Sequence, residues 1–229
     1  MKPTFIDAFS RNVTLSPAST ALLIIDMQNA TGNRAMGLGA LLEAQGTSQA
    51  SSYRFDRIDN LLVPNISRLA DACRDAGARV IYITYGANLP DFSDMPAHMV
   101  GIVRATNNAR GQPEHDIVAA LTPRPGELVL NKTTQGAFRS TGIDTHLRAL
   151  GIETVVAVGV STNNCVAMTA MEACDSQYGV VVVSDATGTD SEQMQEATLT
   201  MLQRLWSRVM TTDEVIAELT AECASAATP

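Results

Sequence analysis

Short apolar runs alternate along the chain with stretches of helical periodicity. The run 20–26 (TALLIID) is almost wholly apolar and ends in a carboxylate, which is typical of a strand buried on both faces of a sheet. In contrast, 65–76 places Ile66, Leu69 and Cys73 on one helical stripe that ends at Gly77. By the same criteria we expect strands at 79–84, 127–131, 154–159, 180–184 and 207–210, and helices at 115–121, 142–150, 163–178, 192–206 and 213–219.

This alternation predicts an α/β fold. Strands that alternate with helices form a parallel sheet with helices on both faces, so we expect a three-layer α/β/α domain with a mainly parallel, doubly wound, six-stranded sheet. The 229 residues suit one such domain, 1–229. The stretch 29–60 is rich in Gly, Ala and Ser and long for a connection. We interpret it as a partly helical lid or interface insertion, with a mobile loop as the alternative.

Charge and cysteine content narrow the class of protein. The formal net charge is −8 and no Lys/Arg cluster occurs, which argues against nucleic acid and anionic membranes as partners. The first apolar run, 21–25, is too short for a signal peptide core or a membrane span, so we expect a cytoplasmic protein. The four cysteines have neither disulfide nor metal-ligand spacing, and we expect thiols.

The carboxyl ends of the predicted strands select three residues with chemical potential. Ligands bind beyond these ends in open α/β sheets, where Asp26, Lys132 and Cys165 are expected. Alone, each has an ordinary interpretation: a turn residue, a solvated lysine and a core cysteine. Together they form a nucleophile, a cation that supports it and a carboxylate that accepts and returns its proton. We expect the helix N-terminus and Lys132 to lower the pKa of the Cys165 thiol.

Four segments carry a resemblance to a known family. They are ALLIIDMQN (21–29), NKTTQGAF (131–138), GVSTNNCV (159–166) and VVVSDATGT (181–189). With these motifs the chain resembles the isochorismatase-like cysteine hydrolases over roughly residues 18–220. The resemblance implies the isochorismatase-like hydrolase fold.

The resemblance also implies an active site. The family's Asp–Lys–Cys triad maps onto Asp26, Lys132 and Cys165. Its non-proline cis peptide maps onto Val160–Ser161, and its oxyanion hole onto the backbone N–H groups of Ser161 and Cys165. Members of this family often form homodimers or homotetramers, which we expect here.

The implied reaction is hydrolysis of a C–N bond in a small linear amide or a ureido or carbamoyl compound. It proceeds through a thioester on Cys165 and releases ammonia or an amine. The family's metal-binding members carry an Asp-x-His near the substrate, whereas His98, His115 and His146 are isolated here, so we expect no metal and no cofactor. The alternatives are a vinyl-ether hydrolase with Asp26 as the acid, and a non-catalytic binding member of the fold.

Several polar and aromatic residues are candidates for substrate binding. They follow predicted strands or lie in the motifs above, and the amide of Gln135 is suited to a polar substrate, although a structural role is equally consistent. The candidates are Asn29, Tyr85, Asn88, Gln135, Phe138 and Asn164.

Overall fold

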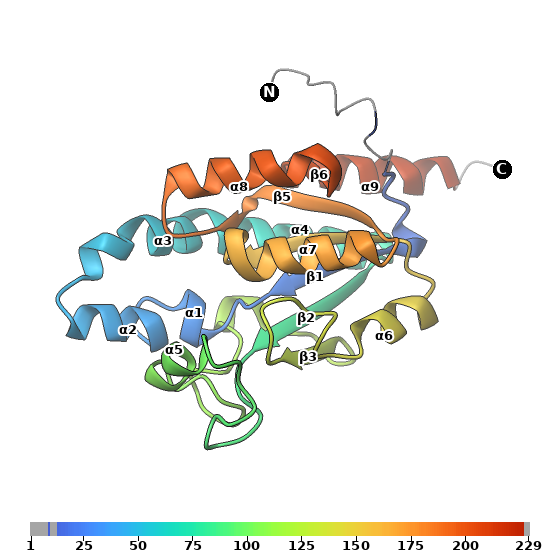
Figure 1. Cartoon of the computed structure of the whole chain (residues 1–229). Coiled ribbons are helices and arrows are strands. Elements are labelled where there is room, and N and C mark those ends of the chain that lie inside the picture. Colours follow the sequence, from blue (N-terminus) through green and yellow to red (C-terminus); the bar gives the residue numbers. More distant parts are fainter. Residues whose placement is uncertain (1–8, 10–12, 227–229) are drawn as a thin grey trace.

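Six parallel strands form the central sheet of the computed structural model, which describes residues 9 and 13–226 (Figure 1). The strands are β1 (Thr20–Ile25), β2 (Arg79–Tyr85), β3 (Leu128–Lys132), β4 (Thr154–Val160), β5 (Gly179–Gly188) and β6 (Arg208–Met210). Their order across the sheet is β3-β2-β1-β4-β5-β6. The chain thus starts in the centre, winds to one edge, returns beside β1 and winds to the other edge. This arrangement confirms the predicted doubly wound α/β fold, and all strand pairs are parallel.

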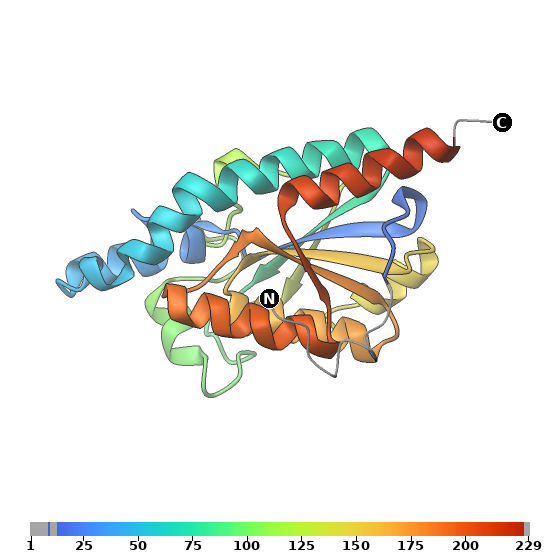
Figure 2. The ribbon, with the colours of Figure 1, turned by 90° about the horizontal axis from the view of Figure 1, so that it is seen from above.

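Helices cover both faces of the sheet (Figure 2). Alternate residues of the central strand β1 point to opposite faces: Leu22 and Ile24 pack in one core, and Leu23 and Ile25 in the other. The first core is covered by α4 and α9, the second by α6, α7 and α8. No helix in the described part of the chain is long and apolar enough to cross a membrane. The helices are α1 (Asn29–Gly32), α2 (Gly37–Ala44), α3 (Ser52–Arg57), α4 (Val63–Ala76), α5 (Val100–Ala105), α6 (Ile143–Ala149), α7 (Ala167–Asp175), α8 (Glu192–Leu205) and α9 (Thr212–Ala226).

The prediction of a helix at 115–121 is wrong. Only Ala119–Leu121 forms a helical turn, of the 3₁₀ type. The residues before it pair instead with the chain that follows β1: Ile117 forms an antiparallel bridge with Gln28, and the Val118 N–H donates to the Met27 carbonyl over 3.0 Å. A tertiary backbone contact therefore replaces the local helix.

The stretch 29–60 is partly helical, as expected, but its second half belongs to a longer element. A π-helical turn, Ile58–Leu62, joins α3 to α4. The apolar stripe of α4 continues backwards through this turn, since Ile58 and Leu62 are fully buried in the same core as Ile66. This extended helix brings the start of α3 over the carboxyl edge of the sheet.

The central strands approach each other closely at Gly159. Gly159 on β4 pairs with Ile25 on β1, and its φ of +111° lies in a region that side chains disfavour. A Cβ on Gly159 would lie 2.0 Å from the Ile25 carbonyl oxygen. Glycine is therefore required one residue before the end of β4, next to the candidate site.

Substituting this glycine is expected to destabilise the fold. Gly159→Ala should lower the free energy of unfolding by more than about 3 kcal/mol. The alanine would have to adopt a strained φ, and the backbone of β1 would have to move away from its Cβ. Gly46→Ala is the matched control: its φ is +68°, but its Cβ would meet nothing within 4 Å, so a cost of only about 1 kcal/mol is expected. The free energy of unfolding of both variants is measured by urea denaturation. An equal loss in the two would contradict the conclusion that the close contact between Gly159 and β1 requires glycine.

Candidate active site

The three predicted catalytic residues meet at the carboxyl edge of the sheet. Asp26 directly follows β1, and Cys165 lies in the π-helical turn Thr162–Val166 that follows β4. Because β1 and β4 are neighbours from which the chain winds in opposite directions, this is the sheet's switch point, where open α/β sheets bind ligands.

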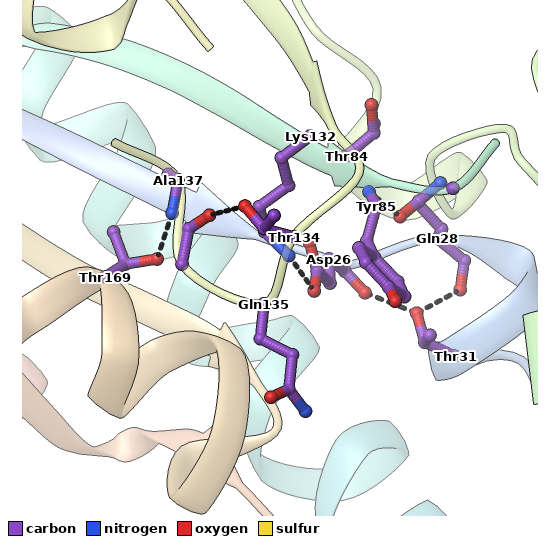
Figure 3. Close-up of polar contacts among 12 residues, drawn as sticks. Asp26, Gln28, Thr31, Thr84, Tyr85, Lys132, Thr134, Gln135, Ala137 and Thr169 are labelled. Carbon is purple, nitrogen blue, oxygen red and sulfur yellow. Dashed lines mark hydrogen bonds and ion pairs between the residues drawn. The ribbon is translucent and has the colours of Figure 1, made fainter. Parts of the chain in front are cut away.

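Lys132 reaches this point from two strands away. It is the last residue of β3 and pairs in register with Tyr85 at the end of β2. Strands lie about 4.8 Å apart, so only a long side chain can cross β2 to reach the end of β1. The Lys132 Nζ passes 4.3 Å from the Tyr85 ring centroid and ends 2.9 Å from Asp26 Oδ2 (Figure 3).

The backbone holds Asp26 in a fixed, left-handed conformation with φ of +53°. Its N–H donates to the Ile83 carbonyl over 2.8 Å, and its carbonyl accepts a bond from the Thr31 hydroxyl. Only one carboxylate oxygen is committed, because Asp26 Oδ1 has no hydrogen-bond partner among the described residues. That oxygen is available to exchange a proton.

Burial dominates the electrostatics of this ion pair. The Lys132 side chain is 0% exposed and that of Asp26 is 2% exposed. Burial raises the pKa of Asp26 above its ordinary value, although Lys132 opposes this, so the carboxylate is a stronger base than usual. Burial by itself would lower the pKa of Lys132, but the Asp26 carboxylate and Cys165 raise it, and Lys132 stays cationic.

The Cys165 thiol differs from the expectation. Burial and the Asp26 carboxylate raise its pKa to about 12, and Lys132 opposes them only in part. Lys132 lowers this pKa, as expected, but the expected net lowering is wrong, because Cys165 is only 8% exposed and lies beside an anion. Cys165 rests as a neutral thiol, next to a carboxylate that can receive its proton.

The turn that carries Cys165 is anchored on both sides. The Val160–Ser161 peptide bond before it is cis, and the Ser161 carbonyl accepts from the Val166 N–H over 3.2 Å. The Thr162 hydroxyl donates to Gln195 of α8 over 2.7 Å. These contacts fix the position of Cys165 relative to β1.

A cavity of about 170 Å³ opens above Cys165 and Asp26. Three of the six substrate-binding candidates line it: Tyr85, Gln135 and Asn164. The Gln135 amide lies 3.8 Å from the sulfur of Met99, which also lines the cavity.

The other three candidates lie outside the cavity lining. The Asn29 amide donates to the Pro113 carbonyl, and Asn88 is bonded to Asp94. Phe138 stacks at a tilt on Tyr178, with 5.9 Å between ring centroids. Each side chain serves the packing of a loop, which sequence position alone does not reveal.

Sequence reasoning missed Arg54, a buried residue of the cavity wall. Its guanidinium, on α3, is 4% exposed and donates to the Ser161 hydroxyl over 2.8 Å. The same group donates to Asp190 over 3.1 Å and to the Thr31 carbonyl over 3.0 Å. The missed signal is the apolar stripe of α4, which extends back to Phe55 and identifies 54 as a helical position near the site.

Among the described residues, no three His, Cys, Asp or Glu side chains are grouped so that they could hold a metal ion. His115 is engaged elsewhere: its Nδ1 lies 2.9 Å from Asn108 Oδ1. Burial and Arg110 lower the pKa of His115 to about 4, so its ring is neutral.

Comparisons with known proteins agree with this geometry. The isochorismatase domain family model matches residues 20–214. The ureidoacrylate amidohydrolase RutB of Caulobacter segnis is 30% identical, covering 87% of this chain and 85% of that protein; that of Rhizobium rhizogenes is 29% identical, covering 90% and 85%. An isochorismatase family protein from Desulfovibrio vulgaris superposes with a TM-score of 0.72 at 28% identity, covering 87% of this chain and 98% of that chain.

The N-carbamoylsarcosine amidase of Thermoplasma acidophilum shares the fold, with a TM-score of 0.66 at 23% identity, covering 85% of this chain and 97% of that chain. The family match spans most of the strands and helices and includes all three residues at the switch point. The chain therefore belongs to the isochorismatase family, in its amidohydrolase branch.

Proposed function

We propose that this chain is a cysteine-dependent amidohydrolase that cleaves the C–N bond of a small linear amide or of a ureido or carbamoyl compound. The observation that carries the proposal is the convergence of Asp26, Lys132 and Cys165 on one buried point below a small cavity. The named relatives, ureidoacrylate amidohydrolases, support the class of reaction.

In the first half-reaction, Cys165 passes its proton to Asp26 as its sulfur attacks the carbonyl carbon. The new S–C bond converts the carbonyl oxygen into an oxyanion, which the backbone N–H groups of Ser161 and Cys165 stabilise. The C–N bond then breaks, and the leaving nitrogen takes the proton from Asp26. A thioester on Cys165 and free ammonia or amine result.

In the second half-reaction, Asp26 takes a proton from a water molecule that attacks the thioester. The S–C bond breaks, and the sulfur recovers the proton, which regenerates the neutral thiol. Throughout, Lys132 stays charged and stabilises the anionic form of Asp26. The raised pKa of Asp26 suits this exchange, since a base is most effective when its pKa approaches the working pH.

Removal of the nucleophile tests the covalent route. Cys165→Ala is expected to lower ammonia release from a panel of amides and ureido compounds by at least about 1,000-fold, because no thioester can form. Cys174→Ser, a second thiol on α7 that does not line the cavity, is the control and should retain activity. Undiminished turnover by Cys165→Ala would contradict the mechanism, and turnover without ammonia or amine would favour the vinyl-ether alternative.

The pH dependence tests the roles of Asp26 and Lys132. The ionised carboxylate is the active form, so kcat/KM should fall as the pH drops through the raised pKa of Asp26. Lys132 lowers that pKa, so Lys132→Met should shift the acid limb to higher pH and reduce activity by at least about 100-fold.

Lys132→Met also leaves a buried carboxyl without its partner, which costs about 3–5 kcal/mol of stability. Circular dichroism should therefore confirm that the variant is folded at each pH. If kcat/KM fell at the same acidic pH in the parent protein and in Lys132→Met, the result would contradict the proposed effect of Lys132 on the pKa of Asp26.

A further inference from the structure

The charged groups that line the cavity are balanced against one another. They are Asp26, Arg54 and Asp190, with Lys132 directly beneath. Arg54 is paired with Asp190 at 3.1 Å, and Lys132 with Asp26 at 2.9 Å. The cavity therefore offers an incoming molecule no uncompensated cation among the described residues.

Among the described residues that line the wall, Arg54 is the one cation that a substrate carboxylate could contact, and all but one of its N–H groups already donate to protein. Of the five N–H groups of a guanidinium, four donate to protein: two to the Thr31 carbonyl, one to the Ser161 hydroxyl and one to Asp190. The remaining N–H can serve a neutral carbonyl. It cannot provide the two parallel bonds with which arginine captures a carboxylate.

The second cation is shielded from the cavity. Lys132 is fully buried, lies against the Tyr85 ring and is bonded to Asp26. The Asp26 carboxylate does line the cavity, and its Oδ1 has no hydrogen-bond partner among the described residues. Because Lys132 neutralises this carboxylate, a substrate carboxylate held near Cys165 would lose its hydration without gaining a cation to pair with.

The remaining lining suits an uncharged molecule. The Tyr85 hydroxyl is buried and also has no hydrogen-bond partner among the described residues, so a neutral acceptor would satisfy it. Burial raises the pKa of Tyr85 above its ordinary value and keeps it a donor. The other polar lining residues are all neutral: Thr31, Thr106, Asn108, Gln135, Ser161 and Asn164. The apolar part of the wall includes Ile102, which is 45% exposed and open to solvent. The apolar lining residues are Ala30, Leu38, Met99, Ile102, Val103 and Val160.

We infer that this cavity selects an uncharged amide or ureide with an apolar substituent, and that Arg54 holds Ser161, Thr31 and Asp190 in place instead of binding a substrate carboxylate. The inference rests on the proposed function, since it places the scissile carbonyl above Cys165. Asp190 is the specificity-determining residue, because its charge cancels that of Arg54.

Binding to the Cys165→Ala variant tests the inference without turnover. Two ligands are compared by calorimetry: succinamate, and its uncharged isostere in which an isopropyl group replaces the carboxylate. The uncharged ligand should bind at least about tenfold more tightly, because the cavity would desolvate a carboxylate without offering it an unpaired cation. Tighter binding of succinamate, or no binding of the uncharged ligand, would overturn the inference.

A second substitution tests the role of Asp190. In the Cys165→Ala background, Asp190→Asn releases the charge of Arg54, and the preference for the uncharged ligand should fall by at least about threefold. Asp213→Asn removes the same charge from an exposed residue that does not line the cavity and should leave the preference unchanged. An unchanged preference in Asp190→Asn would overturn the assignment. The proposed function is tested separately, by comparing ammonia release by the parent protein with that by Cys165→Ala.

Discussion

A fully buried ion pair between Lys132 and Asp26 joins the ends of β3 and β1, two strands that do not touch each other. Burying two charges is costly, and the cost is offset only while both partners remain in contact. The pair therefore constrains everything around it. β3 must end in register with Tyr85, Tyr85 must present its ring to the ammonium group, and the chain must turn sharply at Asp26.

The same pair determines the state of the cysteine. A thiol beside an unshielded lysine would ionise readily, whereas this thiol lies next to a lysine already neutralised by a carboxylate. In the proposed mechanism, Cys165 therefore keeps its proton until a substrate arrives. Asp26 then takes that proton, so Cys165 is activated during the attack and not before it.

A second, more exposed ion pair connects the site to the stretch 29–60. Arg54 bridges α3, the α1 turn at Thr31, the Ser161 hydroxyl and Asp190. Its charge also lowers the pKa of Asp26 slightly against the effect of burial. The stretch 29–60 thus contributes to the geometry beside Cys165 through the bonds of Arg54.

Much of this architecture could be predicted from sequence. Apolar runs such as that of β1 identify buried parallel strands, and the carboxyl-end rule brings Asp26, Lys132 and Cys165 together. What failed depends on tertiary contacts. The 115–121 segment pairs with the chain after β1 and does not form the expected helix.

The electrostatic errors have a similar origin. The pKa of Cys165 depends on burial and on the distance to Asp26, neither of which a motif contains. Arg54 escaped notice because the predicted helix began at residue 65, although the π-helical turn Ile58–Leu62 before it continues the same apolar stripe. Asn29, Asn88 and Phe138 were near the right strands, but the two asparagines bond to Pro113 and Asp94, and Phe138 packs on Tyr178.

The most direct test of the account is the protonation state of Cys165 in the resting enzyme. The measurement compares the ultraviolet absorbance of thiolate in the parent protein with that in Cys165→Ser. The account predicts no difference at neutral pH, because the thiol has a pKa of about 12 beside the Asp26 carboxylate. A thiolate band at neutral pH that disappears in Cys165→Ser would contradict it.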